Sequence, residues 1–190
     1  AVSSPLNKVH RSKELLLRWM ELNAFTTIYR THEGNRPDEN HQFFSDAESL
    51  THFSRCAKIY AAWAFYRKDL VREAAANGQP VVRHPFIHYP EDPNVYGLSY
   101  QQFMVGAEFM VVPVLDRGAN TVTAYLPAGR WVHLWSGRTH DASDSGLRVT
   151  VGAPLGQPGV FYREGSPQAA QFVTNLQEAG VMAPGEIDSL

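Results

Sequence analysis

Cysteine, long apolar runs and clusters of like charge are all scarce in this sequence of 190 residues. Its single cysteine, Cys56, excludes a disulfide framework or a multi-thiolate metal site within the chain. No apolar run approaches the roughly 20 residues that a membrane-spanning helix needs. The net charge is −2, without a basic tract or an acidic tail, which argues against nucleic acid or a membrane as the main partner.

What remains is the composition of a globular protein, with 44% hydrophobic and 19% charged residues. The chain starts at Ala1 rather than at a methionine, and residues 1–10 show no signal-peptide pattern. These opening residues resemble the interior of a longer polypeptide. We therefore expect sequence before Ala1.

The first half of the chain alternates between helical and strand patterns. Ser12 can cap a helix over Lys13–Asn23, with Leu15, Leu16, Trp19 and Met20 on one face. The β-rich stretch Ala24–Tyr29 predicts a buried strand, and a polar loop follows it as far as Gln42.

A long helix comes next. Ser45 and Glu48 form a capping box at its start, Asn77-Gly78 ends it, and its apolar stripe blurs near Arg67–Asp69, where we expect a bend or break. A second short strand follows at Pro80–Arg83. Strand, loop, helix and strand in this order indicate a βαβ unit of a parallel sheet or barrel.

The second half predicts an antiparallel β-sandwich, because short strands are separated by Gly, Pro, Asn and Asp. The expected strands are Phe109–Leu115, Thr121–Leu126, Arg130–Trp135, Arg148–Val151 and Val160–Arg163. One further helix is expected near Ala169–Glu178. The fold class is thus α/β followed by all-β, divided into residues 1–106, 107–165 and a tail, 166–190. The α/β part is too small to close a barrel alone and needs sequence from outside the chain.

The loop Arg30–Arg36 is the richest in polar side chains. Loops at the carboxyl ends of barrel strands carry active sites, and here Arg30, His32 and Glu33 occupy such a position. An imidazole can donate to and accept from hydroxyl groups, and an adjacent carboxylate could fix its tautomer. A solvent-facing polar loop with Gly34 in a turn explains the pattern equally well.

Two other groups of residues favour plainer interpretations. His84 and His88 flank a proline instead of sharing one helical turn, so we expect no metal site and no cofactor. A metal-dependent hydrolase is a further hypothesis about function, and this arrangement argues against it. Trp131 and Trp135 have odd numbers and are expected on one strand face, where core packing is favoured over exposed stacking on sugar rings.

Carboxylates are present, but not as an evident pair. Glycoside hydrolysis needs two that face each other, about 5–5.5 Å apart when the configuration is retained. Asp46 and Glu48 flank a helix start, where capping explains them, and Asp38 and Glu39 are loop charges. Only Glu33 is well placed.

Several motifs in unbroken order resemble glycoside hydrolase family 31. They are Glu14–Trp19, Ala24-Phe25, Arg30–Pro37, Pro80–Arg83 with Pro85, Tyr100–Gly106, Val111–Val114, Tyr125–Pro127, Gly129–Trp131 and Pro158–Tyr162. The likeness covers about Lys13 to Arg163. It implies the last strands of a (β/α)8 TIM barrel followed by the proximal C-terminal β-sandwich.

The resemblance also implies a function. Members are retaining α-glycosidases that use one Asp as nucleophile and another as acid/base, both on earlier barrel strands and hence upstream of Ala1. No catalytic residue is therefore expected in this chain. His32 matches the histidine that lines the −1 sugar subsite, and Arg30 matches the arginine two residues before it. The implied partners are an α-glycoside and the remainder of the barrel.

The common family pattern at this loop is Arg-Asn-His. The sequence Arg-Thr-His-Glu-Gly-Asn-Arg-Pro from Arg30 to Pro37 is closer to the sulfoquinovosidase branch, which hydrolyses α-glycosides of 6-sulfo-6-deoxyglucose. An α-glucosidase or α-xylosidase is the alternative within the family, and a non-catalytic carbohydrate-binding or scaffold module is the alternative from another class. We expect a bacterial cytoplasmic location.

Overall fold

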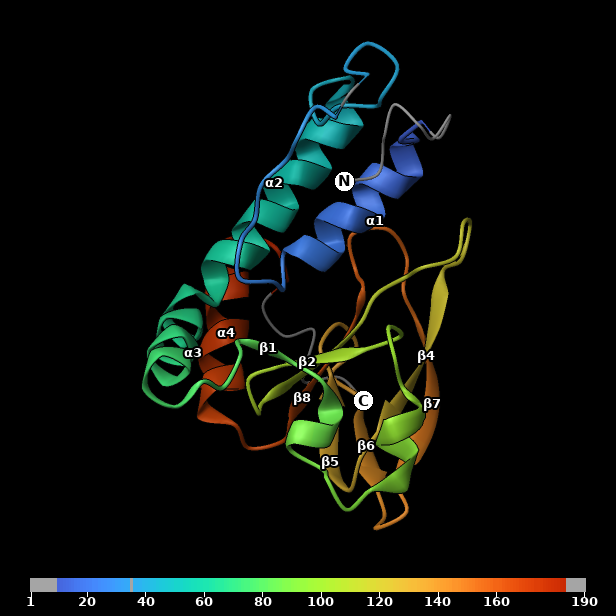
Figure 1. The fold of residues 1–190 in the computed structure, drawn as a ribbon. Helices are drawn as coiled ribbons and strands as arrows, with labels where there is room; N and C mark the ends of the chain where they lie inside the picture. Colours follow the sequence, from blue (N-terminus) through green and yellow to red (C-terminus); the bar gives the residue numbers. More distant parts are fainter. Residues whose placement is uncertain (1–9, 35, 184–190) are drawn as a thin grey trace.

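The computed structural model describes residues 10–34 and 36–183, and shows helices followed by two antiparallel sheets (Figure 1). The predicted loop residue Asn35 and the ends of the first and last predicted segments, 1–9 and 184–190, lie outside these residues. The α-helices are α1 (Lys13–Asn23), α2 (Ala47–Ala62), α3 (Ala64–Asn77) and α4 (Pro167–Glu178). Two short 3-10 helices are η1 (Pro85–Ile87) and η2 (Pro93–Gly97). None of the helices in the described ranges has the length and apolar character required to cross a bilayer.

Helix α1 has the predicted bounds, because the Ser12 side chain accepts a hydrogen bond from the amide of Leu15. Its buried apolar face differs from the expected one. Leu16 and Met20 are buried together with Leu17, whereas Trp19 is 43% exposed. Residues 16, 17 and 20 form the stripe that meets the core, and Leu15 and Trp19, one turn apart, form a neighbouring stripe.

The long predicted helix is two helices, and its start differs by one residue from the prediction. Asp46, not Ser45, is the N-cap of α2, since its Oδ1 accepts from the amide of Ser49 at 2.8 Å. The break falls at Trp63 rather than near Arg67–Asp69. The Trp63 indole is buried and donates to the carbonyl of Ala24 at 2.8 Å, a tertiary contact that the helical pattern does not reveal.

Helix α3 ends as predicted at Gly78, whose φ of 80° lies in the left-handed region that glycine adopts without a steric penalty.

The predicted strand Ala24–Tyr29 is wrong for this structure. Ala24 and Phe25 are buried, but Ile28 is 66% exposed, and no strand is assigned to the segment. A strand forms only where a neighbour completes its ladder of hydrogen bonds, and no described strand pairs with this segment. Tyr29 instead stacks on Phe53 and Tyr60 of α2.

The second predicted strand is present but pairs differently. Strand β1 is antiparallel to β2, with Val82 opposite Val105, so the described residues contain no parallel βαβ unit. The sheets have the strand orders β1-β2-β3-β8-β5-β6 and β4-β7. The strands are β1 (Val82–Arg83), β2 (Phe103–Val105), β3 (Phe109–Val112), β4 (Thr121–Leu126), β5 (Gly129–His133), β6 (Thr139–Ala142), β7 (Leu147–Gly152) and β8 (Gly159–Arg163). Of these, β2 and β6 were not predicted.

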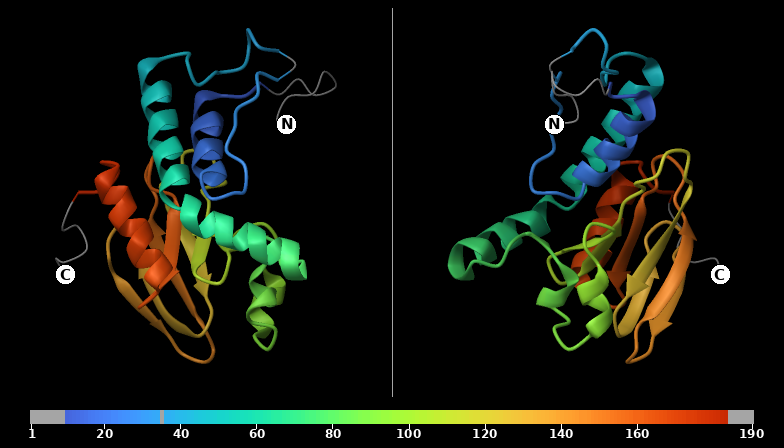
Figure 2. Two further views of the ribbon diagram at one scale, coloured as in Figure 1. Left: turned by 90° about the vertical axis from the view of Figure 1, so that its left-hand side faces the viewer. Right: turned by 45° about the vertical axis from the view of Figure 1, so that its right-hand side comes forward.

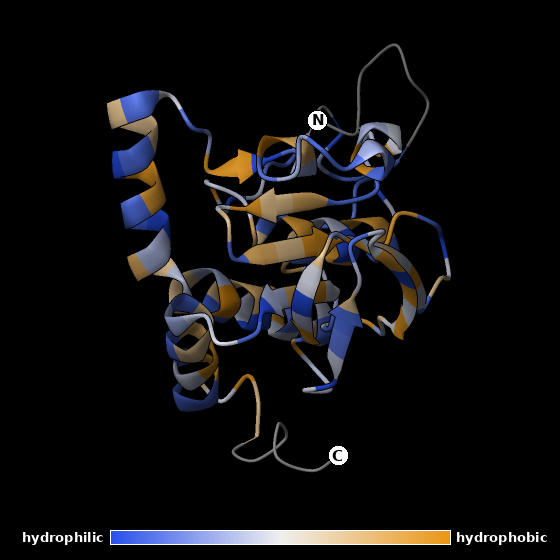
Figure 3. Ribbon diagram, turned by 90° about the horizontal axis from the view of Figure 1, so that it is seen from below, coloured by the Kyte–Doolittle hydropathy of each residue, from blue (hydrophilic) through white to orange (hydrophobic). Residues whose placement is uncertain are grey.

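The two sheets pack against each other, as expected for a sandwich. Their shared core includes Met104, Met110, Leu126, Trp131 and Phe161. Figure 3 shows the apolar residues gathered on the strands at the centre of that view. Burial of these large side chains, at about 25 cal/mol per Å2 of apolar surface, holds the sheets together.

A second core joins the helices to the six-stranded sheet. Side chains of α1, α2 and α4, among them Leu17, Ile59 and Phe172, pack with Phe109 and Val160 of the sheet. Figure 2 shows α4 lying along the sheet and α1 and α2 extending beyond it. The six-stranded sheet contains β1 and β2, which precede residue 106, so it runs across the predicted division of the chain. That division remains a prediction.

Trp131 and Trp135 are both buried, at 0% and 8% exposed, as core packing requires. They do not share one face, because Trp131 lies between the sheets and Trp135 lies in the core shared with the helices. Strand β5 ends at His133, so the alternation of a strand does not extend to Trp135.

Candidate functional site

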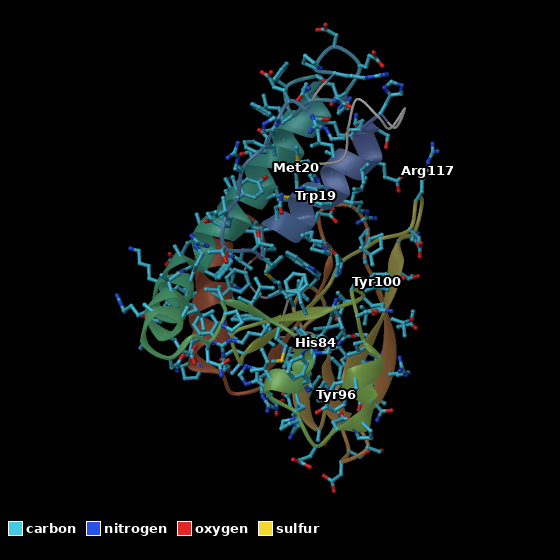
Figure 4. The ribbon with its side chains drawn as sticks, in the orientation of Figure 1. Trp19, Met20, His84, Tyr96, Tyr100 and Arg117 are labelled. Atoms are coloured by element: carbon cyan, nitrogen blue, oxygen red, sulfur yellow. The ribbon has the colours of Figure 1, made fainter. Side chains whose placement is uncertain are left out.

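The polar loop that follows Tyr29 opens onto a small cavity of about 110 Å3. Arg30 and His32, both exposed, line it together with Tyr29. The stripe of Leu15 and Trp19 on α1 also lines it. Figure 4 labels Trp19 and Met20 on this helix. The cavity thus brings together two of the three predicted site residues with an exposed indole ring.

The orientation of His32 is set by its own loop. Its Nδ1 accepts a hydrogen bond from the amide of Gly34 at 3.0 Å. In the neutral imidazole the proton must then be on Nε2, which makes Nε2–H a donor. Gly34 has a φ of 80°, a conformation that glycine adopts readily and that turns its amide back toward the ring.

The Glu33 carboxylate does not fix the tautomer of His32, the role that its place next to the histidine suggested. Its side chain is exposed, and the hydrogen bond that fixes the His32 tautomer comes from the Gly34 amide. The main-chain carbonyl of Glu33 accepts from the side chains of Asn40 and Gln42, both at 3.2 Å. Glu33 therefore contributes its backbone to the loop.

Arg11 is a loop-organising residue that the sequence did not reveal. Its guanidinium donates from Nη1 to the carbonyl of His32 at 2.7 Å, from Nε to the carbonyl of His41 at 2.9 Å, and from Nη2 to Oε1 of Gln42 at 2.7 Å. Its main-chain amide donates to Oδ1 of Asn40 at 2.9 Å. These partners are 21 to 31 positions away, and no local motif marks such a contact.

The carboxylates at the start of α2 are engaged in ion pairs. Lys13 Nζ lies 2.8 Å from Asp46 Oδ2 and 2.6 Å from Glu48 Oε2. The hydrogen bond from Lys13, with the amide of Ser49 next, holds the pKa of Asp46 well below its usual range. The capping role predicted for Asp46 is confirmed, and neither carboxylate lines the cavity beside His32.

The two histidines considered as metal ligands are bonded to neighbouring groups. His84 Nε2 lies 2.8 Å from the carbonyl of Leu98, and His88 Nε2 lies 3.1 Å from Nη1 of Arg83. Within residues 10–34 and 36–183 no three His, Cys, Asp or Glu side chains are arranged to hold a metal ion.

Comparison with known proteins identifies the second half of the chain. Residues 78–166 match the profile of the glycosyl hydrolase family 31 C-terminal domain. The sulfoquinovosidase of Escherichia coli (strain K12) is 45% identical over 169 residues, which cover 89% of this chain and 24% of that protein. Alpha-glucosidase 2 of Bacillus thermoamyloliquefaciens is 33% identical over 167 residues, or 87% of this chain and 20% of that protein.

A solved structure extends the likeness to the helices. The family 31 sulfoquinovosidase from E. rectale, in complex with an aza-sugar inhibitor, superposes with a TM-score of 0.82 at 38% identity over 92% of this chain and 26% of that one. The chain thus spans about a quarter of the length of these relatives. Residues 78–166 are therefore the C-terminal domain of glycoside hydrolase family 31, and the similarity to a member of that family extends over 92% of the chain.

Proposed function

We propose that the chain is the C-terminal part of a retaining α-glycosidase, most specifically a sulfoquinovosidase, in which His32 lines the pocket for the glycone. In this proposal the two reactive aspartates belong to polypeptide that precedes Ala1 in the intact protein. One forms the covalent glycosyl intermediate, and the other protonates the leaving oxygen and then activates water.

The observation that carries the proposal is the position of the polar loop. It follows the segment Ala24–Tyr29, which pairs with no described strand and leaves Ile28 66% exposed. Trp19, on the same side of α1 as the cavity, is 43% exposed. Large apolar side chains left uncovered beside an unpaired segment are what a barrel strand and its helix would present when their neighbours are elsewhere in the polypeptide.

The chemistry of His32 suits a sugar pocket. With Nδ1 occupied by the Gly34 amide, Nε2–H can donate to a sugar hydroxyl or to an oxygen that gains charge in the transition state. Arg30, which lines the same cavity, would provide further hydrogen-bond donors for the sugar.

The sulfoquinovosidase substrate is supported by the 45% identity with the Escherichia coli enzyme of that name, and by the sequence of the loop from Arg30 to Pro37. An α-glucosidase is the second candidate, since Alpha-glucosidase 2 is 33% identical over a similar stretch. The carbohydrate-binding module receives no support from the two tryptophans on which it depended, because Trp131 and Trp135 are buried.

The test is a glycoside panel with the intact protein. We expect hydrolysis of 4-nitrophenyl α-sulfoquinovoside to exceed that of the α-glucoside and α-xyloside, with the α-anomer released first in the proton NMR spectrum. Preference for the α-glucoside would transfer the assignment to the second candidate, and release of the β-anomer would contradict retention. The chain Ala1–Leu190 alone should be inactive, and sugar binding by it would favour the module.

A further inference from the structure

Arg11 is a half-buried cation whose side-chain hydrogen bonds all go to neutral oxygens. The side chain is half-buried, and among the described residues no carboxylate forms an ion pair with it. Burial lowers the pKa of this guanidinium. Removing a charge partly from water without a counter-ion has a cost that a neutral side chain would not carry, so the use of arginine here points to the geometry of its donors.

The three donors close the loop on itself. One bond goes to His32 near the start of the loop and the other two go to His41 and Gln42 at its end. The amide of His41 in turn donates to the Arg11 carbonyl at 3.0 Å. A planar guanidinium presents its donors in a fixed fork, so it sets the spacing of three acceptors at once, which a lysine ammonium cannot reproduce.

One of these hydrogen bonds, from Arg11 to the carbonyl of His32, acts on the residue whose ring is proposed to contact the sugar. Arg11 holds the His32 carbonyl, and the Gly34 amide holds the His32 ring. Arg11 also lines the cavity next to Arg30 and Trp19. With its backbone and ring both held, the imidazole is oriented before any ligand arrives, which is the condition for a hydrogen bond that strengthens in a transition state.

We propose that Arg11 is a positioning residue for the glycoside reaction, acting through the backbone of His32. This rests on the proposed function. The guanidinium itself does not touch the substrate. It fixes the direction of Nε2–H, so its loss lowers kcat more than it changes KM.

The first experiment is a double-mutant cycle in the intact protein, with 4-nitrophenyl α-sulfoquinovoside as the substrate. Arg11→Lys is expected to lower kcat/KM by roughly tenfold to a hundredfold, because small misplacements of catalytic groups have effects of that size. In a His32→Ala background the same substitution should have almost no further effect, since it then has nothing to orient. Arg72→Lys, at a side chain that is 76% exposed, should retain wild-type kinetics.

A second experiment separates positioning from folding. Arg11→Gly should recover part of its kcat in millimolar guanidinium chloride and none in sodium chloride of equal ionic strength. Arg18→Lys, which disturbs hydrogen bonds to Ala119 between β3 and β4 and to Pro154 between β7 and β8, should lower the melting temperature without this rescue. If Arg11→Gly is insoluble, the double-mutant cycle of Arg11→Lys with His32→Ala tests the positioning role by itself.

The outcomes distinguish the two proposals. Additive losses in the cycle, or wild-type kinetics for Arg11→Lys, would overturn the positioning role while leaving the proposed function intact. An active enzyme in which His32→Ala has no effect would remove His32 from the site, and the role of Arg11 with it.

Discussion

Glu21 on α1 accepts a hydrogen bond at 2.6 Å from the main-chain amide of Gly156, which lies 135 positions later in the loop between β7 and β8. The same carboxylate accepts from Arg18 Nη1 at 2.9 Å, and both side chains are buried. Arg55 of α2 donates to the carbonyl of Gly156 at 3.0 Å. Charged side chains of α1 and α2 therefore bind both the main-chain amide and the main-chain carbonyl of Gly156 in this loop.

Breaking this junction should be costly. Glu21→Ala leaves Arg18 as an unpaired buried cation and removes the acceptor for the Gly156 amide, so we expect a loss of about 3–5 kcal/mol in the free energy of unfolding. Glu21→Gln keeps an acceptor and should cost less. Urea denaturation of the intact protein measures both, with Asp69→Asn on the exposed face of α3 as a control within about 0.5 kcal/mol of wild type. Equal stabilities of all three variants would show that the junction does not contribute.

Stability should fall in mild acid because of His133. This residue is 4% exposed, and burial, together with the nearby His140, lowers its pKa to about 4. The unfolded state, with a pKa of about 6.5, then binds the proton more readily, so stability is complete above that pH and is lost as the pH falls toward 4. We expect a loss of roughly 2 kcal/mol between pH 7.5 and 5 from this residue.

The matched variant for this effect is His133→Phe, which removes the titrating group while keeping a ring against Phe161. Its unfolding free energy should depend less on pH than that of the wild type over the same range. Some acid sensitivity should remain, because burial also lowers the pKa of His52. A variant with the wild-type pH dependence would contradict the assignment to His133.

Gly106 should not tolerate a side chain. Its φ is 57°, and a Cβ there would overlap the hydroxyl of Tyr66. Gly165 has a φ of 77° but open space around it, which makes it the matched control. Gly165→Ala should cost about 1 kcal/mol through its backbone conformation alone, and Gly106→Ala a further 1–3 kcal/mol through overpacking. Thermal melting of the two variants tests the difference, and equal melting temperatures would refute it.

Local signals predicted local structure well in this chain. Ser12 and Gly78 mark helix ends where the sequence placed them, and β4 has the predicted bounds Thr121–Leu126. Each of these depends on residues within a few positions. The same holds for α4, which begins two residues before the predicted Ala169 and ends at Glu178.

The failures are tertiary in origin. The segment Ala24–Tyr29 has strand composition but no described neighbour to pair with. The break between α2 and α3 lies at Trp63, whose indole donates a hydrogen bond to the distant Ala24 carbonyl. Arg11 reaches its loop across 21 to 31 positions. For the site, the family motif drew attention to His32 and Arg30, which line one cavity, but no pattern in the sequence could reveal the arginine that holds their loop.

The most direct test of the account is the effect of His32→Ala on kcat/KM of the intact protein with 4-nitrophenyl α-sulfoquinovoside, beside His140→Gln in the sandwich as a control. Loss of an oriented donor to a sugar hydroxyl should cost about 2–3 kcal/mol of transition-state stabilisation, or roughly 30- to 150-fold in kcat/KM, with the control unchanged. Wild-type kinetics for His32→Ala would mean that this imidazole does not face the sugar.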